Sequence, residues 1–149
     1  MLVVLDPENR SQLAAVVERS PGCDAEILRA DLRTKRGIVC YSDSDPRVVK
    51  VRFYPDAARF HWVLPGDYAH EKLYALAVFA LTRAFARWPD VADLPLDATV
   101  VDPEIAAKWA ARMDTDAQAG ARARVVSLEH SYRVEGPTVR EILRDYKAR

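Results

Sequence analysis

The sequence predicts an α+β domain whose mixed, mainly antiparallel sheet is flanked by helices and followed by an extra C-terminal helix. Two observations in the middle of the chain carry this prediction. Residues 38–41, 48–54 and 59–64 are rich in β-branched and aromatic residues, and the hairpin-like turn sequences SDSDP and PDAA separate them. A long helix over about residues 70–88 follows, with apolar residues at helical spacing on more than one side. We therefore expect three consecutive antiparallel strands and a helix buried in the centre of the domain.

The N-terminal quarter of the chain predicts one short strand and two helices. Residues 2–5 form a short β-type run, and Asp6 and Pro7 supply a helix N-cap and a first-turn proline. The Ser-Pro-Gly sequence at residues 20–22 ends this helix. Asp24 then caps a second helix. Two short helices therefore follow the first strand.

The chain after the central helix predicts two more strands with a helix between them. Residues 98–101 are typical of a strand, which ends where Asp102, Pro103 and Glu104 start a helix in the manner of the first one. Residues 124–134 are typical of a single further strand. These elements complete the predicted sheet.

The last segment predicts an amphipathic helix that stands apart from the sheet. The pair Gly136 and Pro137 separates it from the preceding strand. We therefore expect a domain over residues 1–136 and a C-terminal amphipathic helix over residues 137–149. The apolar stripe of this helix, at i, i+3, i+4 and i+7, consists of Val139, Ile142, Leu143 and Tyr146.

The composition is that of a single domain without a charge bias. The chain has 149 residues, and its 22 Lys and Arg residues balance its 22 Asp and Glu residues, so it gives no strong nucleic-acid signal. The longest apolar run, residues 73–81, is too short for a membrane span. We therefore expect a soluble protein without a membrane partner, cytoplasmic, or virion-associated if it comes from a phage. Cys23 and Cys40 lack metal-site spacing, so no metal is expected.

The order of these elements resembles the GNAT family of N-acetyltransferases. In that fold two helices follow the first strand, a β-meander leads into a central helix, and a strand, a helix and a strand pair complete the sheet. The segment FHWVLPGDYAHEKLYALAVFAL, residues 60–81, looks like the strand and helix that receive the acyl-CoA pyrophosphate. The segment VVDPEIAAKWAARMDTD is similar to the pattern N-x-x-A-x-x-x-Y-x-x-x-G-F, with Ala106 at its alanine. The resemblance covers about residues 1–134 and implies a GNAT-like fold.

The chain departs from this family at two places. Members carry R/Q-x-x-G-x-G/A between strand and helix, because glycine lets the backbone amides approach a pyrophosphate at the helix N-terminus. Here residues 68–74 all bear side chains, and Glu71 places a negative charge where phosphates would lie. In the later segment, the tyrosine that often protonates the departing thiolate falls on Ala110. The sequence therefore indicates a GNAT-like fold, but it lacks the residues by which the family usually binds the acyl-CoA pyrophosphate and protonates the thiolate.

A few residues remain candidates for binding or transferring an acyl group. Leu64 ends the strand before the junction, and His70 and Lys72 offer positive charge beside the phosphates, so these three are the candidate cofactor contacts. His61 is the candidate general base, because the ordinary pKa of histidine lies near neutral, and Tyr68 is the candidate acid. The alternative is that His61 lies on an ordinary sheet surface and that His70 and Lys72 are ordinary solvated residues.

Two hypotheses about function remain open at this point. The preferred one is a non-catalytic GNAT-like structural or partner-binding protein of bacterial or phage type, which uses no cofactor. In this hypothesis the C-terminal helix docks on a protein partner or on a second copy of the chain. The alternative for this helix is that its apolar stripe folds back over an open side of the same domain. The alternative is a divergent N-acyltransferase that uses acetyl-CoA or another acyl-CoA. The separation of the last meander strand from the strand near residues 98–101 distinguishes them, because family members open a cleft there for the pantetheine arm.

Overall fold

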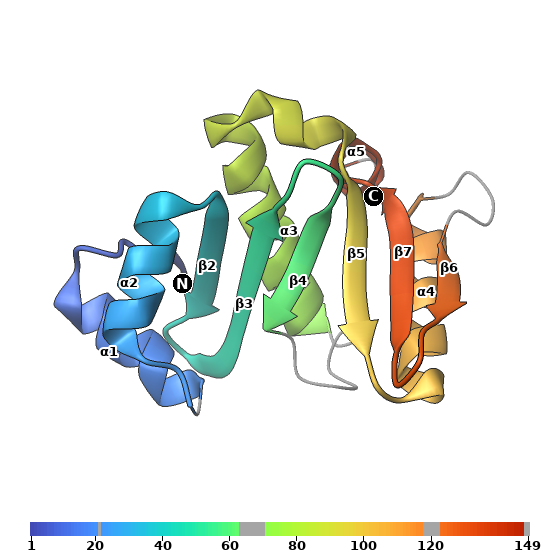
Figure 1. Cartoon of the computed structure of the whole chain (residues 1–149). Helices are drawn as coiled ribbons and strands as arrows, with labels where there is room; N and C mark the ends of the chain where they lie inside the picture. The colour runs from blue at the N-terminus through green and yellow to red at the C-terminus, as the bar shows by residue number, and fades with distance from the viewer. Residues whose placement is uncertain (21, 63–70, 118–122, 148–149) are drawn as a thin grey trace.

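The protein is built on one seven-stranded sheet with the strand order β1-β2-β3-β4-β5-β7-β6 (Figure 1). The computed structural model describes residues 1–20, 22–62, 71–117 and 123–147. Neighbouring strands are antiparallel except for β4 and β5, which are parallel. The predicted α+β class with a mixed, mainly antiparallel sheet is therefore confirmed. The strands are β1 (Leu2–Val4), β2 (Gly37–Ser42), β3 (Asp45–Phe53), β4 (Ala58–Trp62), β5 (Pro95–Val100), β6 (Arg124–Ser127) and β7 (Tyr132–Thr138).

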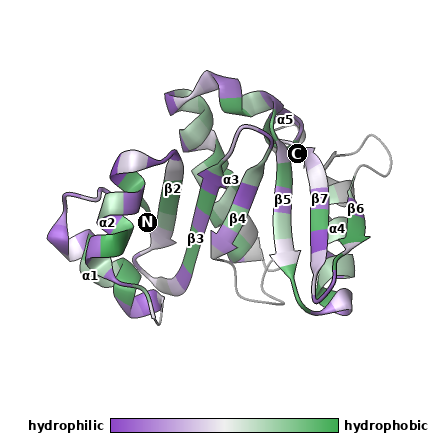
Figure 2. Cartoon of the chain, viewed as in Figure 1, coloured by the Kyte–Doolittle hydropathy of each residue, from purple (hydrophilic) through white to green (hydrophobic). Residues whose placement is uncertain are grey.

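The helices cover the two faces of the sheet unequally. Figure 1 shows α1 and α2 on one face beside β1 to β3, whereas α3 and α4 lie behind the opposite face. Among the described residues, no helix covers the first face across β4, β5 and β7. Figure 2 shows hydrophilic and hydrophobic residues alternating along the central strands, as expected when the two faces of a sheet differ. The helices are α1 (Arg10–Arg19), α2 (Ala25–Thr34), α3 (Glu71–Arg87), the 3-10 helix η2 (Pro89–Asp93), α4 (Pro103–Ala117) and α5 (Val139–Lys147).

The N-terminal elements agree with the sequence except at the start of α1. The N-cap of α1 is Asn9, whose side chain accepts a hydrogen bond from the Gln12 amide, so the prediction of Asp6 as the cap is wrong. Asp6 instead accepts from the Glu8 amide in a local turn that precedes the helix. Asp24 caps α2 as predicted, accepting from two amides of the first turn.

The meander and the central helix were both predicted correctly. Strands β2, β3 and β4 are consecutive antiparallel neighbours. Helix α3 buries residues on more than one of its sides, since Leu76 and Leu81 are each 1% exposed and Val78 is also buried. Together with the inner sheet residues these side chains form the main core.

The C-terminal part differs from the single predicted strand over residues 124–134. The chain forms two antiparallel strands, β6 and β7, joined by a turn in which the Leu128 amide donates to the Ser131 carbonyl. Gly136 and Pro137 lie inside β7 and do not separate a strand from a helix. A Cβ atom at Gly136 would collide with the sulfur of Met113, so glycine allows β7 to approach α4 closely.

Helix α5 packs on the same core as the rest of the chain. Val139 is fully buried and Ile142 is 1% exposed, and Leu143 packs against them. The helix contacts α3, α4, η2 and β7. Val139, Ile142 and Leu143, three of the four residues of the stripe that was considered as a docking surface, are therefore packed against this chain itself.

Candidate functional site

The parallel pairing of β4 and β5 ends before either strand does. The ladder joins Ala58 to Leu96, Arg59 to Asp97 and Phe60 to Ala98. Beyond these pairs β4 continues to residue 62 and β5 continues to residue 100. Because the two strands are parallel, their carboxyl ends lie at the same end of the sheet, and Figure 1 shows them diverging there. The sheet is therefore interrupted at the carboxyl ends of its two central strands.

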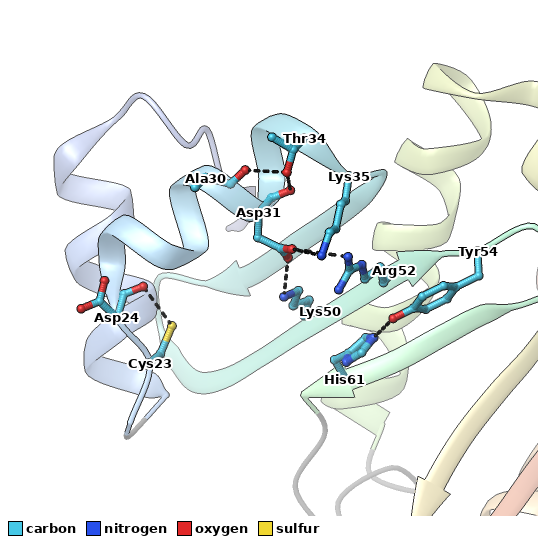
Figure 3. A network of polar contacts seen from close by, with 10 residues as sticks. All are labelled: Cys23, Asp24, Ala30, Asp31, Thr34, Lys35, Lys50, Arg52, Tyr54 and His61. Carbon is cyan, nitrogen blue, oxygen red and sulfur yellow. Dashed lines mark hydrogen bonds and ion pairs between the residues drawn. The ribbon is translucent and has the colours of Figure 1, made fainter.

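A β-bulge in β4 lies next to this interruption. Val51 of β3 is opposite Phe60, whereas its neighbour Lys50 is opposite Trp62, so His61 is the additional residue. Bulges leave one residue unpaired in the ladder and redirect its side chain. Here the side chain of His61 points to the face of the sheet that carries Tyr54 (Figure 3).

His61 and Tyr54 form a hydrogen-bonded pair. The phenolic oxygen of Tyr54 lies 3.1 Å from Nε2 of His61, and either atom can donate, depending on the imidazole tautomer. Partial burial lowers the pKa of His61 below its ordinary value, and the positive charges of Lys50, Arg52 and Arg59 lower it further. His61 is therefore neutral at pH 7 and has one ring nitrogen able to accept a proton.

Several cations surround one carboxylate beside this pair. Lys50 Nζ lies 3.0 Å from Asp31 Oδ2, Arg52 Nη2 lies 3.5 Å from Asp31 Oδ1, and Lys35 Nζ lies 3.6 Å from the same oxygen. Figure 3 shows the three cations converging on Asp31 from α2 and β3. One carboxylate therefore balances three positive charges next to His61.

A row of charged residues runs across the strands β3, β4, β5, β7 and β6. In adjacent strands, Arg52, Arg59, Asp97, Glu135 and Arg124 are consecutive ladder partners. Arg59 Nη2 lies 3.0 Å from Asp97 Oδ2, and Arg124 Nη2 lies 3.2 Å from Glu135 Oε1. Asp97 is only 6% exposed, and its second carboxylate oxygen, Oδ1, is buried without a hydrogen-bond partner in the described part of the chain.

This sheet face is more positive than the chain as a whole. The formal charge of the chain is zero, whereas the described residues on this face include more cations than carboxylates. An anionic molecule would therefore be attracted here in preference to a cationic one. The cations are Lys35, Lys50, Arg52, Arg59, Arg124 and Arg133, and the carboxylates are Asp31, Asp97 and Glu135.

The structure locates two of the five residues proposed from the sequence. His61 lies at the bulge beside the interrupted ladder, and Lys72 is exposed in the first turn of α3. Leu64, Tyr68 and His70 lie outside the described residues.

The sequence reasoning missed the residues that surround His61. Arg52 and Tyr54 were predicted only to lie on the polar side of one strand, and Arg59 only to begin the next strand. The alternation of Lys50, Arg52 and Tyr54 with apolar residues did place these three on one face of β3. The alternation does not give the register of β4 against β3, and this register brings Arg59 and His61 beside the polar residues of β3.

Other kinds of site receive less support. Among the described residues, no group of three or more His, Cys, Asp or Glu side chains is placed to hold a metal ion. None of the described helices combines the length and the hydropathy that a bilayer crossing needs. An open, largely apolar groove of about 500 Å³ lies at edge strand β1, three strands away from β4, and includes Val4, Phe79 and Arg83 in its lining.

A comparison of the chain with protein families, curated proteins and solved structures gave no match. The assignment of a function therefore depends on the geometry of this sheet face.

Proposed function

We propose that this chain is a GNAT-like domain that transfers an acyl group from an acyl-CoA to an amine at the diverging ends of β4 and β5. Two features support the proposal. The order of strand, two helices, meander, central helix, strand, helix and strand pair is the order that the resemblance implies. The early end of the β4–β5 ladder is the feature that distinguishes an acyl-CoA cleft from a closed sheet, and it is the observation that carries the proposal.

The positive charge of the open sheet face suits acyl-CoA, which is a negatively charged ligand. Acyl-CoA carries several negative charges. Lys50 is opposite Trp62 at the carboxyl end of β4, and Arg52 and Arg59 form the ladder pair farther back, in the part of β4 that still pairs with β5. The bound thioester supplies the activated acyl carbon. The junction over residues 63–70, where the family holds the pyrophosphate, lies outside the described residues.

His61 is the proposed general base. An amine must lose a proton as its nitrogen bonds to the acyl carbon and the carbon–sulfur bond breaks. A neutral imidazole accepts that proton, and a tautomer in which Nε2 donates to Tyr54 leaves Nδ1 free to do so. The positive charges that lower the pKa of His61 also make the resulting imidazolium a ready proton donor to the departing thiolate. Tyr54 is a positioning residue that fixes the orientation of the ring.

The test measures release of the CoA thiol from acetyl-CoA with a panel of amines. We expect turnover that His61→Gln lowers by about 100-fold to 10,000-fold, the usual range for loss of a general base. Thr82→Ala, on the exposed side of α3, is the matched control and should keep full activity.

A binding measurement accompanies the assay. A dissociation constant near 0.1 mM would give about 1.4 kcal/mol of stabilisation at about 1 mM acetyl-CoA, which raises the melting temperature measurably. Neither a thermal shift nor thiol release from acetyl-CoA and longer acyl-CoA thioesters would contradict the proposed activity.

The second candidate is a non-catalytic structural or partner-binding protein with a GNAT-like fold. The start of α3 favours it, because Leu73 is 2% exposed and fills with an apolar side chain part of the segment where the family pattern has glycine. Its partner would contact the polar outer side of α5, for example at Arg140, since Val139 and Ile142 are buried. Light scattering after size exclusion tests self-association, and a strict monomer with a clear acetyl-CoA thermal shift would reject this candidate.

A further inference from the structure

Two arginines oppose each other directly on the open face of the sheet. Arg52 of β3 and Arg59 of β4 are ladder partners. Their guanidinium carbons lie 5.3 Å and 4.7 Å from the centre of the Tyr54 ring, so each cation contacts the same aromatic side chain. Like charges directly opposite each other on neighbouring strands are destabilising unless an anion offsets them.

The carboxylates nearby offset these two charges only in part. Arg52 has a single ion pair, at 3.5 Å, with Asp31, which Lys50 and Lys35 also share. Arg59 uses Nη2 for Asp97. No other carboxylate of the described residues forms an ion pair with either guanidinium, although the charge of Asp56 is felt by Arg59 at longer range. Each guanidinium has five N–H donors, so both retain donors for a further oxyanion.

The surroundings favour a bound oxyanion at this place. The side chains of Arg52 and Arg59 are 17% and 30% exposed, so water competes weakly for their donors. Planar guanidinium groups in such surroundings bind carboxylates through paired hydrogen bonds. Tyr54 links the arginines to the proposed base, because its ring lies beside both guanidiniums and its hydroxyl contacts His61.

We propose that Arg52 and Arg59 bind the carboxylate of the acyl acceptor, and that the acceptor is therefore an amino acid or a similar small amine that carries a carboxylate. The carboxylate lies on the two arginines, and the amine lies beside His61, on the other side of Tyr54. The role of this molecule as an acyl acceptor rests on the proposed acyl transfer, whereas the binding of a carboxylate by the two arginines does not. A phosphate of the acyl-CoA has the same oxyanion chemistry, so the experiment must separate these two sources.

The binding experiment uses the full chain without acyl-CoA. Individual amino acids and their carboxamides are compared by thermal shift and by calorimetric titration. We expect at least one amino acid to bind and its carboxamide, which lacks the negative charge, to bind about 10-fold to 100-fold more weakly. Equal binding of acid and amide, or no binding of any amino acid, would overturn the proposal.

Variants assign the effect to these arginines. Arg52→Lys keeps the charge next to Asp31 but removes the planar fork, and Arg59→Gln combined with Asp97→Asn removes a charge pair without leaving a buried carboxylate alone. Both variants should lower amino-acid affinity by about 10-fold or more, given the strength of charge-assisted hydrogen bonds. Arg33→Gln, which removes an exposed arginine of α2 that is paired with Glu8, is the control and should bind normally.

The two sources of the oxyanion give opposite outcomes. If Arg52→Lys weakens acetyl-CoA binding and leaves amino-acid binding unchanged, the arginines hold a cofactor phosphate and the inference fails. Amino-acid binding without any thiol release would keep the inference and reject acyl transfer. Acyl transfer to simple amines as fast as to amino acids would keep the proposed function and reject the inference.

Discussion

Lys50 of β3 and Asp31 of α2 form an ion pair of 3.0 Å that is almost enclosed by protein. Their side chains are 11% and 18% exposed. Arg52 and Lys35 reach the same carboxylate, so Asp31 is the anchor by which α2 holds the polar side of β3. Removing one partner of such a cluster leaves buried charges of one sign without compensation.

Replacing Asp31 by Ala should therefore destabilise the protein strongly. We expect a loss of about 3 to 5 kcal/mol in the free energy of unfolding, because Lys50 and Arg52 would both lose their ion pair with this carboxylate at a largely enclosed place. Urea denaturation measures this loss. Glu26→Ala, which removes an exposed carboxylate 4.0 Å from Arg29 on the same helix, is the control and should change stability by less than about 1 kcal/mol. A loss below that bound for Asp31→Ala would mean that the cluster does not anchor α2.

The same residue should make stability depend on acid pH. Burial opposes ionisation of Asp31, but the hydrogen bond and charge of Lys50 and the charges of Arg52 and Lys35 outweigh it, so the pKa of Asp31 lies below its ordinary value. A carboxyl group with a lowered pKa in the folded state contributes stability above its unfolded pKa, near 4, and this contribution is lost as pH falls through the folded value.

The wild type should therefore lose more stability than Asp31→Asn between about pH 6 and about pH 2.5. Chemical denaturation at several pH values gives both curves, and their difference isolates Asp31 from the other acidic residues. Parallel curves over this range would show that Asp31 has an ordinary pKa in the folded protein.

Truncation of a core residue of α3 should cost far more than truncation on its exposed side. Leu76 is 1% exposed, so Leu76→Ala should lower the free energy of unfolding by about 2 to 5 kcal/mol through lost burial and the remaining cavity. Thr82→Ala, on the exposed side, should change it by less than about 0.5 kcal/mol. Similar small effects at both positions would remove α3 from the core.

The C-terminal helix should be required for stability. Ile142 is 1% exposed in the main core, so Ile142→Ala should cost about 2 to 5 kcal/mol, and deletion of residues 137–149 should abolish cooperative unfolding. Arg140→Ala removes an exposed contact of 3.5 Å with Asp93 and should cost less than about 1 kcal/mol. A deletion variant that unfolds with the wild-type midpoint would show instead that α5 is an accessory element.

The two cysteines should differ sharply toward thiol reagents. Burial raises the pKa of Cys40 to about 12, and this residue is fully buried. Burial also raises the pKa of Cys23, but this residue is only half-buried. The thiol of Cys23 should react slowly in the folded protein, whereas the thiol of Cys40 should react only at the rate of unfolding. Mass spectrometry identifies the labelled position, and early labelling of Cys40 would contradict its burial.

The sequence predicted the meander because its signals are local. Turn residues separate three β-type segments, and the alternation of Val49, Val51 and Phe53 with polar residues defines which face of β3 is buried. The hairpin formed by β6 and β7 was missed, because the turn residues Glu129 and His130 lie within what was taken as one strand. The N-cap was misplaced because Asp6 and Asn9 are equally good capping residues, and tertiary contacts decide between them.

The site was predictable only in part. His61 could be proposed from its chemistry and its position before the junction. Its partner Tyr54 could not, because the contact depends on the β3–β4 register and on the bulge, and a register shift of one residue reverses which side chains share a face. The opposed arginines were missed for the same reason, since ladder pairing is a property of two strands together.

The short ladder between β4 and β5 also has a mechanical consequence. Strands β1 to β4 form one antiparallel group and β5 to β7 form another. In the part of the chain that the structure describes, the sheet connects the two groups only through the pairs of residues 58–60 with residues 96–98. The sheet therefore has a seam of low stiffness at its centre. Bending motions should concentrate at this seam, because each group can tilt as a unit without breaking its own hydrogen bonds. A molecule that enters beside His61 would lie at the junction between these two groups of strands.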